Sequence, residues 1–208
     1  MTLPIAPVKR ESGDDRKVAI ALAARALIVE KGIEGLRTRD IAQRVGINIA
    51  TLHYHVPSKE ALIELVTETM ITEFRAQSIS RPRAHLPPTE QLEHEFADFQ
   101  EMYNEKSDVL AVMSELIERA RRDEIIRATI LPVLAKWRSI VANLFALGVA
   151  DGSFRADLDP EPAAQMLIGA MVSFSRGPDP TPENFERLCA ELRRAVRNPS
   201  TLPPSLRG

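Results

Sequence analysis

Residues 36–62 read LRTRDIAQRVGINIATLHYHVPSKEAL and carry the clearest structural signal in the chain. Thr38 is a suitable N-cap residue for a helix, and Asp40 would lie in the first turn, where the helix dipole favours an anion. Gly46 can adopt the left-handed conformation that ends a helix. A helix, a glycine turn and a second helix form the helix-turn-helix arrangement, whose second helix enters the major groove of DNA.

The second helix of this motif has its own start and stop signals. Asn48 is expected to cap it, and Leu52 is expected to face inward. Pro57 would end this helix, and Ser58 would cap the next one. The side chains expected on or near its surface are Thr51, His53, Tyr54 and His55.

The runs Thr38–Ala42, Val45–Ile47 and Thr51–Leu62 together resemble the TetR family of one-component transcriptional regulators. The match is long and ungapped and covers about a quarter of the chain. The family usually shows Leu-Tyr-(aromatic or His)-(His or Tyr)-Phe where this chain has the residues 52–56, LHYHV. The resemblance implies an all-α fold of about nine helices, with an N-terminal three-helix helix-turn-helix head and a larger C-terminal helical domain for ligand binding and dimerisation.

Working outward from the motif, prolines and polar turns separate further helical patterns. These predict a head with an N-terminal arm at 1–57, a helical ligand-binding and dimerisation domain at 58–197, and a disordered tail at 198–208. Leu22, Ala26 and Val29 recur at helical spacing in the first helix. Outside the motif, helices are expected at 15–31, 58–77, 89–105 and 108–120, with Thr89 as the cap of the third. Asp123 is expected to open the next helix, which Pro132 would kink or restart. The last two expected helices run from Pro160 through Phe174, capped by Asp159, and from Thr181 to Val196.

Composition restricts the class of protein. Residues 1–60 hold ten Lys/Arg and seven Asp/Glu, a net charge of +3, whereas the whole chain has −2, so the mildly basic part coincides with the motif. No apolar run reaches the roughly 18 residues that span a bilayer. Residues 1–15 contain no apolar stretch typical of a secretion signal. The single cysteine, Cys189, fits a reducing compartment. We expect a cytoplasmic protein with no membrane partner.

Catalytic and metal-binding patterns are not found in the sequence. His53 and His55 are two residues apart, so on a helix they point about 200° away from each other, whereas chelation from a helix prefers residues four apart. The sequence has no nucleophile elbow, glycine-rich phosphate loop or HExxH motif. We therefore predict no enzyme activity, no catalytic residues, no metal and no cofactor.

The expected partner of the head is double-stranded operator DNA with pseudo-palindromic half-sites. Lys59 resembles the family's phosphate-binding lysine, and Arg39 is the second cation expected on the backbone. Ile49 and Ala50 have no hydrogen-bonding group and are expected to contact thymine methyl groups. The predicted DNA-binding residues are Thr38, Arg39, Asn48, Ile49, Ala50, Thr51, His53, Tyr54, His55 and Lys59.

In the larger domain, apolar side chains either line a ligand cavity or fill a core. The resemblance implies a cavity for a small apolar or amphipathic effector, with Met102, Tyr103, Met113, Trp137 and Phe145 as predicted lining residues. The helix from Pro160 is apolar almost all round, so it is either an internal helix or a subunit interface. We predict a homodimer interface formed by Ala163, Leu167, Ala170, Met171, Phe174, Leu188 and Leu192.

These expectations describe a repressor that a small-molecule effector releases from its operator. Two alternatives stay open. One is a regulator of the same fold without a small-molecule ligand. The other is a helical enzyme or adaptor in which the helix-turn-helix is vestigial and binds no specific DNA.

Overall fold

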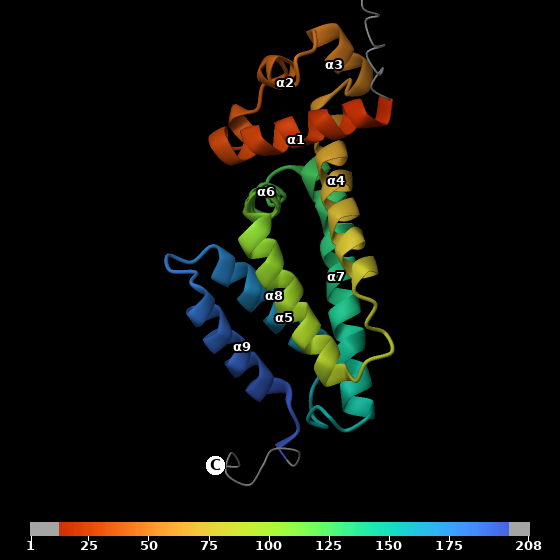
Figure 1. Cartoon of the computed structure of the whole chain (residues 1–208), viewed down its shortest axis with the longest axis vertical. Coiled ribbons are helices and arrows are strands. Elements are labelled where there is room, and N and C mark those ends of the chain that lie inside the picture. Colours follow the sequence, from red (N-terminus) through yellow and green to blue (C-terminus); the bar gives the residue numbers. More distant parts are fainter. Residues whose placement is uncertain (1–12, 200–208) are drawn as a thin grey trace, which may run out of the picture. The chain divides into compact units, whose positions relative to one another are not determined.

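The computed structural model describes residues 13–199, which form nine α-helices, one short 3-10 helix and a single isolated β-bridge between Phe154 and Arg197. The chain divides into two compact units, Met1–Met70 and Ile71–Gly208, with the boundary inside a helix. The helices are α1 (Gly13–Lys31), η1 (Ile33–Gly35), α2 (Thr38–Val45), α3 (Ile49–His55), α4 (Lys59–Ser80), α5 (Pro88–Glu105), α6 (Ser107–Arg119), α7 (Glu124–Ala150), α8 (Pro160–Ser175) and α9 (Pro182–Val196) (Figure 1). The all-helical fold is confirmed for the described residues.

In the first unit, α1 packs against α2, and α2 packs against α3. The buried face of α1 differs from the spacing noted in the sequence: Leu22 is 42% exposed and Val29 is 49% exposed, whereas Ile20, Ala24 and Leu27 are buried. Alanines at several turns of α1 leave two faces with similar apolar patterns, and the packing of α2 decides which one is covered.

The turn between α2 and α3 has the geometry that its sequence predicts. Gly46 has φ 75 and ψ 31, the left-handed conformation that a glycine adopts without strain. The Ile47 amide donates to the carbonyl of Ala42 and so satisfies one of the last carbonyls of α2. The N-cap position of α2 is Arg37, not the predicted Thr38, which is the first helical residue; no side chain caps this end.

The second unit contains α5 to α9. Its core joins α5, α7, α8 and α9 through the buried side chains Leu92, Phe96, Phe99, Val141, Leu144, Phe145, Phe154, Leu158, Leu167, Met171, Phe185, Cys189, Leu192 and Val196. Side chains of Asp123, Asp159 and Thr181 accept backbone hydrogen bonds at the starts of α7, α8 and α9, as predicted. Thr89 does not cap α5, which begins one residue earlier at Pro88, because proline suits the first turn of a helix.

The longest helix, α7, continues through Pro132 and does not restart there. Its buried face includes Ile130, Val141, Leu144 and Gly148. By length and composition α7 alone, among the described helices, would be apolar enough to cross a membrane. It packs against α5, α6 and α8 through its buried residues, whereas Leu131, Ile140 and Leu147 are 51%, 49% and 45% exposed.

The turn after α7 closes tightly onto the helix. The Phe154 ring lies against Gly148, where an added Cβ would be 2.0 Å from Cδ2 of the ring. The Phe154 amide donates to the Gly148 carbonyl at 2.9 Å. Glycine is therefore required at position 148 because of the close approach of the ring and not because of its backbone conformation.

Charged side chains join α5 to α9. Arg193 donates to both carboxylate oxygens of Glu93 at 2.8 and 3.0 Å and lies over the Phe96 ring at 5.2 Å. Hydrogen bonds from Arg193 to Glu93 and Glu186 raise the pKa of Arg193, so the guanidinium stays charged.

The start of the expected disordered tail is held in place. Asn198 donates through its amide to the carbonyl of Ser153 at 3.1 Å and through Nδ2 to the carbonyl of Gly152 at 2.9 Å. The rest of the tail from residue 200, and the N-terminal arm through residue 12, lie outside the described residues.

Candidate nucleic-acid interface

The recognition helix α3 is fixed from its start and from one buried side chain. Asn48 Oδ1 accepts a hydrogen bond from the Thr51 amide at 2.7 Å, as the sequence predicts. Leu52 is 1% exposed and anchors the helix to the head. Val56, which follows the helix, is also buried. The cap and the buried anchors together set which face of α3 points outward.

That outward face exposes large side chains that the head does not bury. Ile49 is 44% exposed and Tyr54 is 84% exposed. Tyr54 and His55 form an edge-to-face ring pair with centroids 5.1 Å apart. Ala50 and His53 are also exposed, whereas Thr51 and His55 are half-buried. An apolar and an aromatic side chain kept in water on a seven-residue helix indicate a surface that binds a partner.

The predicted phosphate-binding cations are also exposed. Lys59 is the first residue of α4, immediately after Ser58, whose Oγ accepts a hydrogen bond from the Ala61 amide at 3.1 Å. Arg39 is exposed in the first turn of α2, next to the exposed Thr38. The structure thus leaves both cations accessible for contacts that a DNA backbone would offer.

Two ion pairs that the sequence analysis did not foresee join α1 to α2. Arg44 donates to both oxygens of Glu30 at 2.8 and 3.0 Å, and Lys31 donates to Asp40 at 2.7 Å. The hydrogen bond from Arg44 lowers the pKa of Glu30, so this pair stays ionised at neutral pH. These two cations are already neutralised by carboxylates, which sets them apart from Arg39 and Lys59. A residue pair fourteen positions apart in the sequence has no local signal.

In the second unit, the predicted pocket residues occupy different places. Phe145 is fully buried and packs edge-to-face on Phe154, with centroids 5.6 Å apart, so it fills the core instead of lining a cavity. Tyr103 borders a small hollow with an empty volume of about 190 Å³. The indole Nε1 of Trp137 lies 3.5 Å from a Glu95 oxygen. Met102 and Met113 are buried, and their role as lining residues stays a prediction.

The residues predicted for the dimer interface fall into two groups by their burial within the subunit, and the interface itself stays a prediction. Ala163, Leu167, Met171 and Leu192 are buried within the subunit's own core against α5 and α7, so they have no surface left for a second copy. Ala170, Phe174 and Leu188 are only partly buried and remain available. An all-round apolar helix does not reveal from its sequence which face the subunit covers by itself.

A capped, outward-facing helix after a left-handed glycine turn, flanked by exposed cations, defines a helix-turn-helix transcriptional regulator. Residues 20–66 match the model of a family described as bacterial regulatory proteins, tetR family. The helix-turn-helix head of this chain is therefore similar to that of the TetR family of transcriptional regulators.

Other proteins are similar to this chain over most of its length, well beyond the head. The transcriptional repressor KstR2 of Rhodococcus jostii (strain RHA1) is 27% identical over 169 residues, which is 80% of this chain and 81% of that protein. A regulator from Saccharomonospora viridis, solved in complex with choline, has a TM-score of 0.78 at 19% identity, covering 88% of this chain and 98% of that chain. AibR, solved with isovaleryl coenzyme A and operator DNA, has a TM-score of 0.72 at 22% identity with the same coverage.

The exposed lysine gives the first prediction. Lys59→Ala should weaken binding to all DNA sequences about equally and reduce the salt slope of log K by roughly one unit, because a phosphate contact releases counterions without reading bases. Titration of a labelled duplex across a salt series measures this slope. The control is Arg194→Ala, an exposed arginine of α9 that pairs with Glu191. An unchanged slope in Lys59→Ala would remove Lys59 from the interface.

Proposed function

We propose that this protein is a cytoplasmic, homodimeric repressor that binds a pseudo-palindromic operator and is released from it by a small-molecule effector. The observation that carries the proposal is the outward face of α3, where Ile49, Ala50, His53 and Tyr54 are exposed on a rigidly capped helix. Two such helices in a dimer would read two half-sites one helical turn of DNA apart.

On this proposal, the residues of α3 divide into two roles. Ile49 and Ala50, at the start of the helix, have apolar side chains that suit contact with thymine methyl groups. His53 and Tyr54 supply hydrogen-bonding groups for base edges or phosphates. Thr38, Arg39, Asn48, Thr51, His55 and Lys59 complete the proposed interface as backbone contacts or supports of α3. Backbone contacts give affinity, and the α3 face gives sequence preference.

Selection of binding sites from a random DNA pool tests the proposal directly. We expect a pseudo-palindromic consensus, and Ala50→Arg should shift the selected bases within each half-site, because arginine prefers guanine in the major groove. The same change at Ala111, an exposed position of α6, serves as the control and should leave the consensus intact. A failure of the wild-type protein to enrich any sequence would contradict the proposed function.

For the dimer, the proposal uses the outward face of α8. Met166 is 43% exposed there, and Gly169 has no atom within 4 Å of the position that a Cβ would occupy. A glycine inside a helix costs about 0.5–1 kcal/mol relative to alanine, and nothing in the isolated subunit requires it. Close approach of a second α8 would explain it, with the half-buried Ala170, Phe174 and Leu188 contributing at the edges.

Gly169→Arg therefore tests the interface without disturbing the subunit core. The dimer dissociation constant should rise at least about 100-fold, which corresponds to roughly 2.8 kcal/mol. Analytical ultracentrifugation measures the change, and the helical circular dichroism signal should stay intact. Gly169→Ala is the matched control, because a methyl group adds little bulk and improves helix propensity. A Gly169→Arg protein that remains a dimer would place the interface elsewhere.

The effector would bind in the second unit. The hollow beside Tyr103 is also lined by the rings of Phe174 and Phe185 and by the amides of Gln100 and Asn104, a combination that suits an amphipathic molecule. The space inside it that could hold a molecule is only about 10 Å³, far below the roughly 300–1,000 Å³ typical of ligand pockets, so binding would have to enlarge it. The choline and acyl-coenzyme A complexes of its structural neighbours support effector control in this fold.

An effector found by thermal-shift screening should weaken operator affinity by a factor of about 5–150, the usual range of allosteric coupling. Operator DNA must then weaken effector binding by the same factor. Trp137 is the only tryptophan, so its fluorescence reports on the second unit alone. Tyr103→Ala should reduce effector affinity, and Ala111→Ser, at an exposed position that does not line the hollow, serves as the control. A bound compound that leaves operator affinity unchanged would be a bystander and would contradict control through this site.

A further inference from the structure

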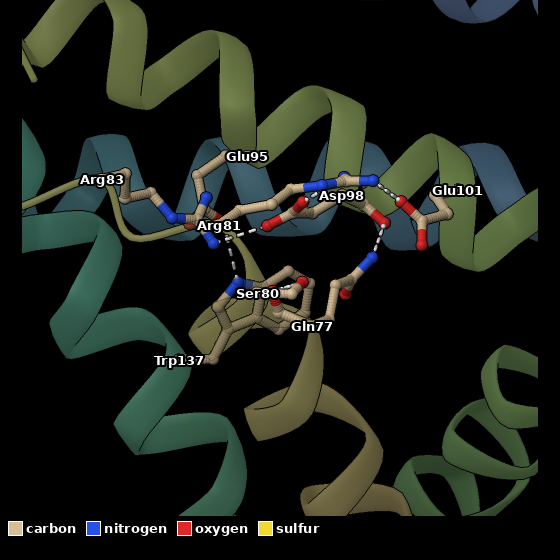
Figure 2. Close-up of polar contacts among 8 residues, drawn as sticks. All are labelled: Gln77, Ser80, Arg81, Arg83, Glu95, Asp98, Glu101 and Trp137. Carbon is tan, nitrogen blue, oxygen red and sulfur yellow. Dashed lines mark hydrogen bonds and ion pairs between the residues drawn. The ribbon is translucent and has the colours of Figure 1, made fainter.

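The segment after α4 is fixed by an unusual concentration of charge. Arg81 pairs with Asp98 and Glu101 of α5, and Arg83 pairs with Glu95 and Asp98 (Figure 2). The Arg83 distances are 3.1 Å to Glu95 Oε1 and 2.5 Å to Asp98 Oδ2. We use the term clasp for the set Arg81, Arg83, Glu95, Asp98 and Glu101.

Hydrogen bonds connect the last turns of α4 to the clasp. Gln77 donates through Nε2 to the backbone carbonyl of Asp98 at 3.1 Å, and Ser80 Oγ donates to the carbonyl of Gln77 at 2.7 Å. Figure 2 shows these side chains gathered between the end of α4 and one side of α5. The end of α4 is therefore bound to α5 by the uncharged amide of Gln77, and the segment 81–87 is bound to it by the charged side chains of Arg81 and Arg83.

Within the clasp, Asp98 and Glu95 have different kinds of partner. Asp98 accepts from both arginines, whereas Glu95 accepts from Arg83 and, at a longer 3.5 Å, from the indole of Trp137 on α7. Glu95 is only 8% exposed. The charged groups that face it are Arg83 from the segment and Asp98 from its own helix; the group from α7 is the uncharged indole.

We propose that Glu95 is the ionisable residue that closes this clasp, so that protonation of its carboxylate releases Arg83 and loosens the segment that follows α4. A neutral carboxylic acid no longer attracts the guanidinium electrostatically, and the proton that it gains occupies an oxygen that otherwise accepts. Arg83 would keep its pair with Asp98 alone. Glu95 thus acts as a proton-sensitive positioning residue and has no contact role in DNA binding.

The environment of Glu95 makes this proton exchange accessible. Burial raises the pKa of Glu95, and the attraction of Arg83 and the hydrogen bond of Trp137 only partly oppose this effect. The nearby charge of Asp98 acts in the same direction as burial. Glu95 is therefore expected to take up a proton at a higher pH than an ordinary glutamate does.

Trypsin provides a direct test, because it cleaves after arginine only when the side chain and backbone become accessible. Arg81 is followed by Pro82, a bond that trypsin does not cut, so Arg83–Ala84 is the one tryptic bond in residues 81–87. Glu95→Gln mimics the protonated state at neutral pH with the same shape. We expect cleavage after Arg83 in the full-length variant to be about tenfold faster than in wild type, measured by mass spectrometry, since cleavage tracks the population of the open form.

Two controls separate local release from unfolding. Glu101→Gln removes a carboxylate that pairs with Arg81, so cleavage after Arg83 should stay at the wild-type rate. Cys189 is fully buried, and burial raises the pKa of its thiol to about 12, so its reaction with a thiol reagent reports opening of the core. Faster cleavage without faster Cys189 labelling supports the clasp. Unchanged cleavage, or labelling that rises in parallel with cleavage, overturns it.

The fluorescence of Trp137 in the wild-type protein provides a second readout. The emission of Trp137 in the wild-type protein should titrate with a midpoint above the ordinary value for glutamate, because the indole contacts Glu95. This titration should vanish in Glu95→Gln and persist in Glu101→Gln. A wild-type emission that stays flat until the protein unfolds, monitored by circular dichroism, would overturn the assignment of Glu95 as the proton-sensitive residue.

Discussion

The proposed recognition surface depends on the burial of Leu52. Helix α3 has only seven residues, and an isolated helix of that length is unstable in water because few hydrogen bonds repay the cost of nucleation. Its conformation must therefore come from outside the helix. Leu52 supplies the tertiary contact, Asn48 caps the first turn, and Gly46 directs the chain into it. The same arrangement leaves Ile49 and Tyr54 in water, so stability of the head and exposure of its reading face arise from one packing contact.

The second unit is held together by two kinds of contact, and one of them leaves the segment between α4 and α5 sensitive to protonation on our proposal. Apolar burial fixes α5, α7, α8 and α9 without directionality. Charged pairs supply the directional contacts. Arg193 with Glu93 joins α9 to α5, and the clasp joins the segment after α4 to α5. In the first pair, Arg193 also bonds to Glu186, and these carboxylates keep its guanidinium charged. In the clasp, burial of Glu95 disfavours its charged form. The Arg193–Glu93 pair therefore stays formed, whereas the Arg83–Glu95 pair depends on the protonation of Glu95.

Local chemistry explains which features the sequence could predict. Asn48, Asp123, Asp159 and Thr181 cap helices because their side chains meet backbone amides two or three residues away, and no distant contact is needed. The exposed face of α3 follows from the same local rules together with the family resemblance. The starts of α2 and α5 differ from prediction by one residue, because Arg37 and Pro87, both in extended conformations, occupy the cap positions there.

Features that depend on distant contacts could not be predicted in this way. Leu167 and Met171 lie on a helix that is apolar on every side, so only the positions of α5 and α7 determine that they face inward. The clasp joins Arg81 to Glu101, 20 positions further along the chain, and the pair of Trp137 with Glu95 spans 42 positions. Charged residues in such positions read from the sequence as solvated surface groups.

The contact between Gly148 and the Phe154 ring also limits how this sequence can change over generations. Any side chain at position 148 would overlap the ring, so a mutation there is excluded while phenylalanine remains at 154. A smaller residue at 154 would open a cavity in the core, with a stability loss of several kcal/mol. Each single step is costly, whereas a joint exchange that moves volume from one position to the other conserves the packing. Positions 148 and 154 are therefore expected to change together and not one at a time.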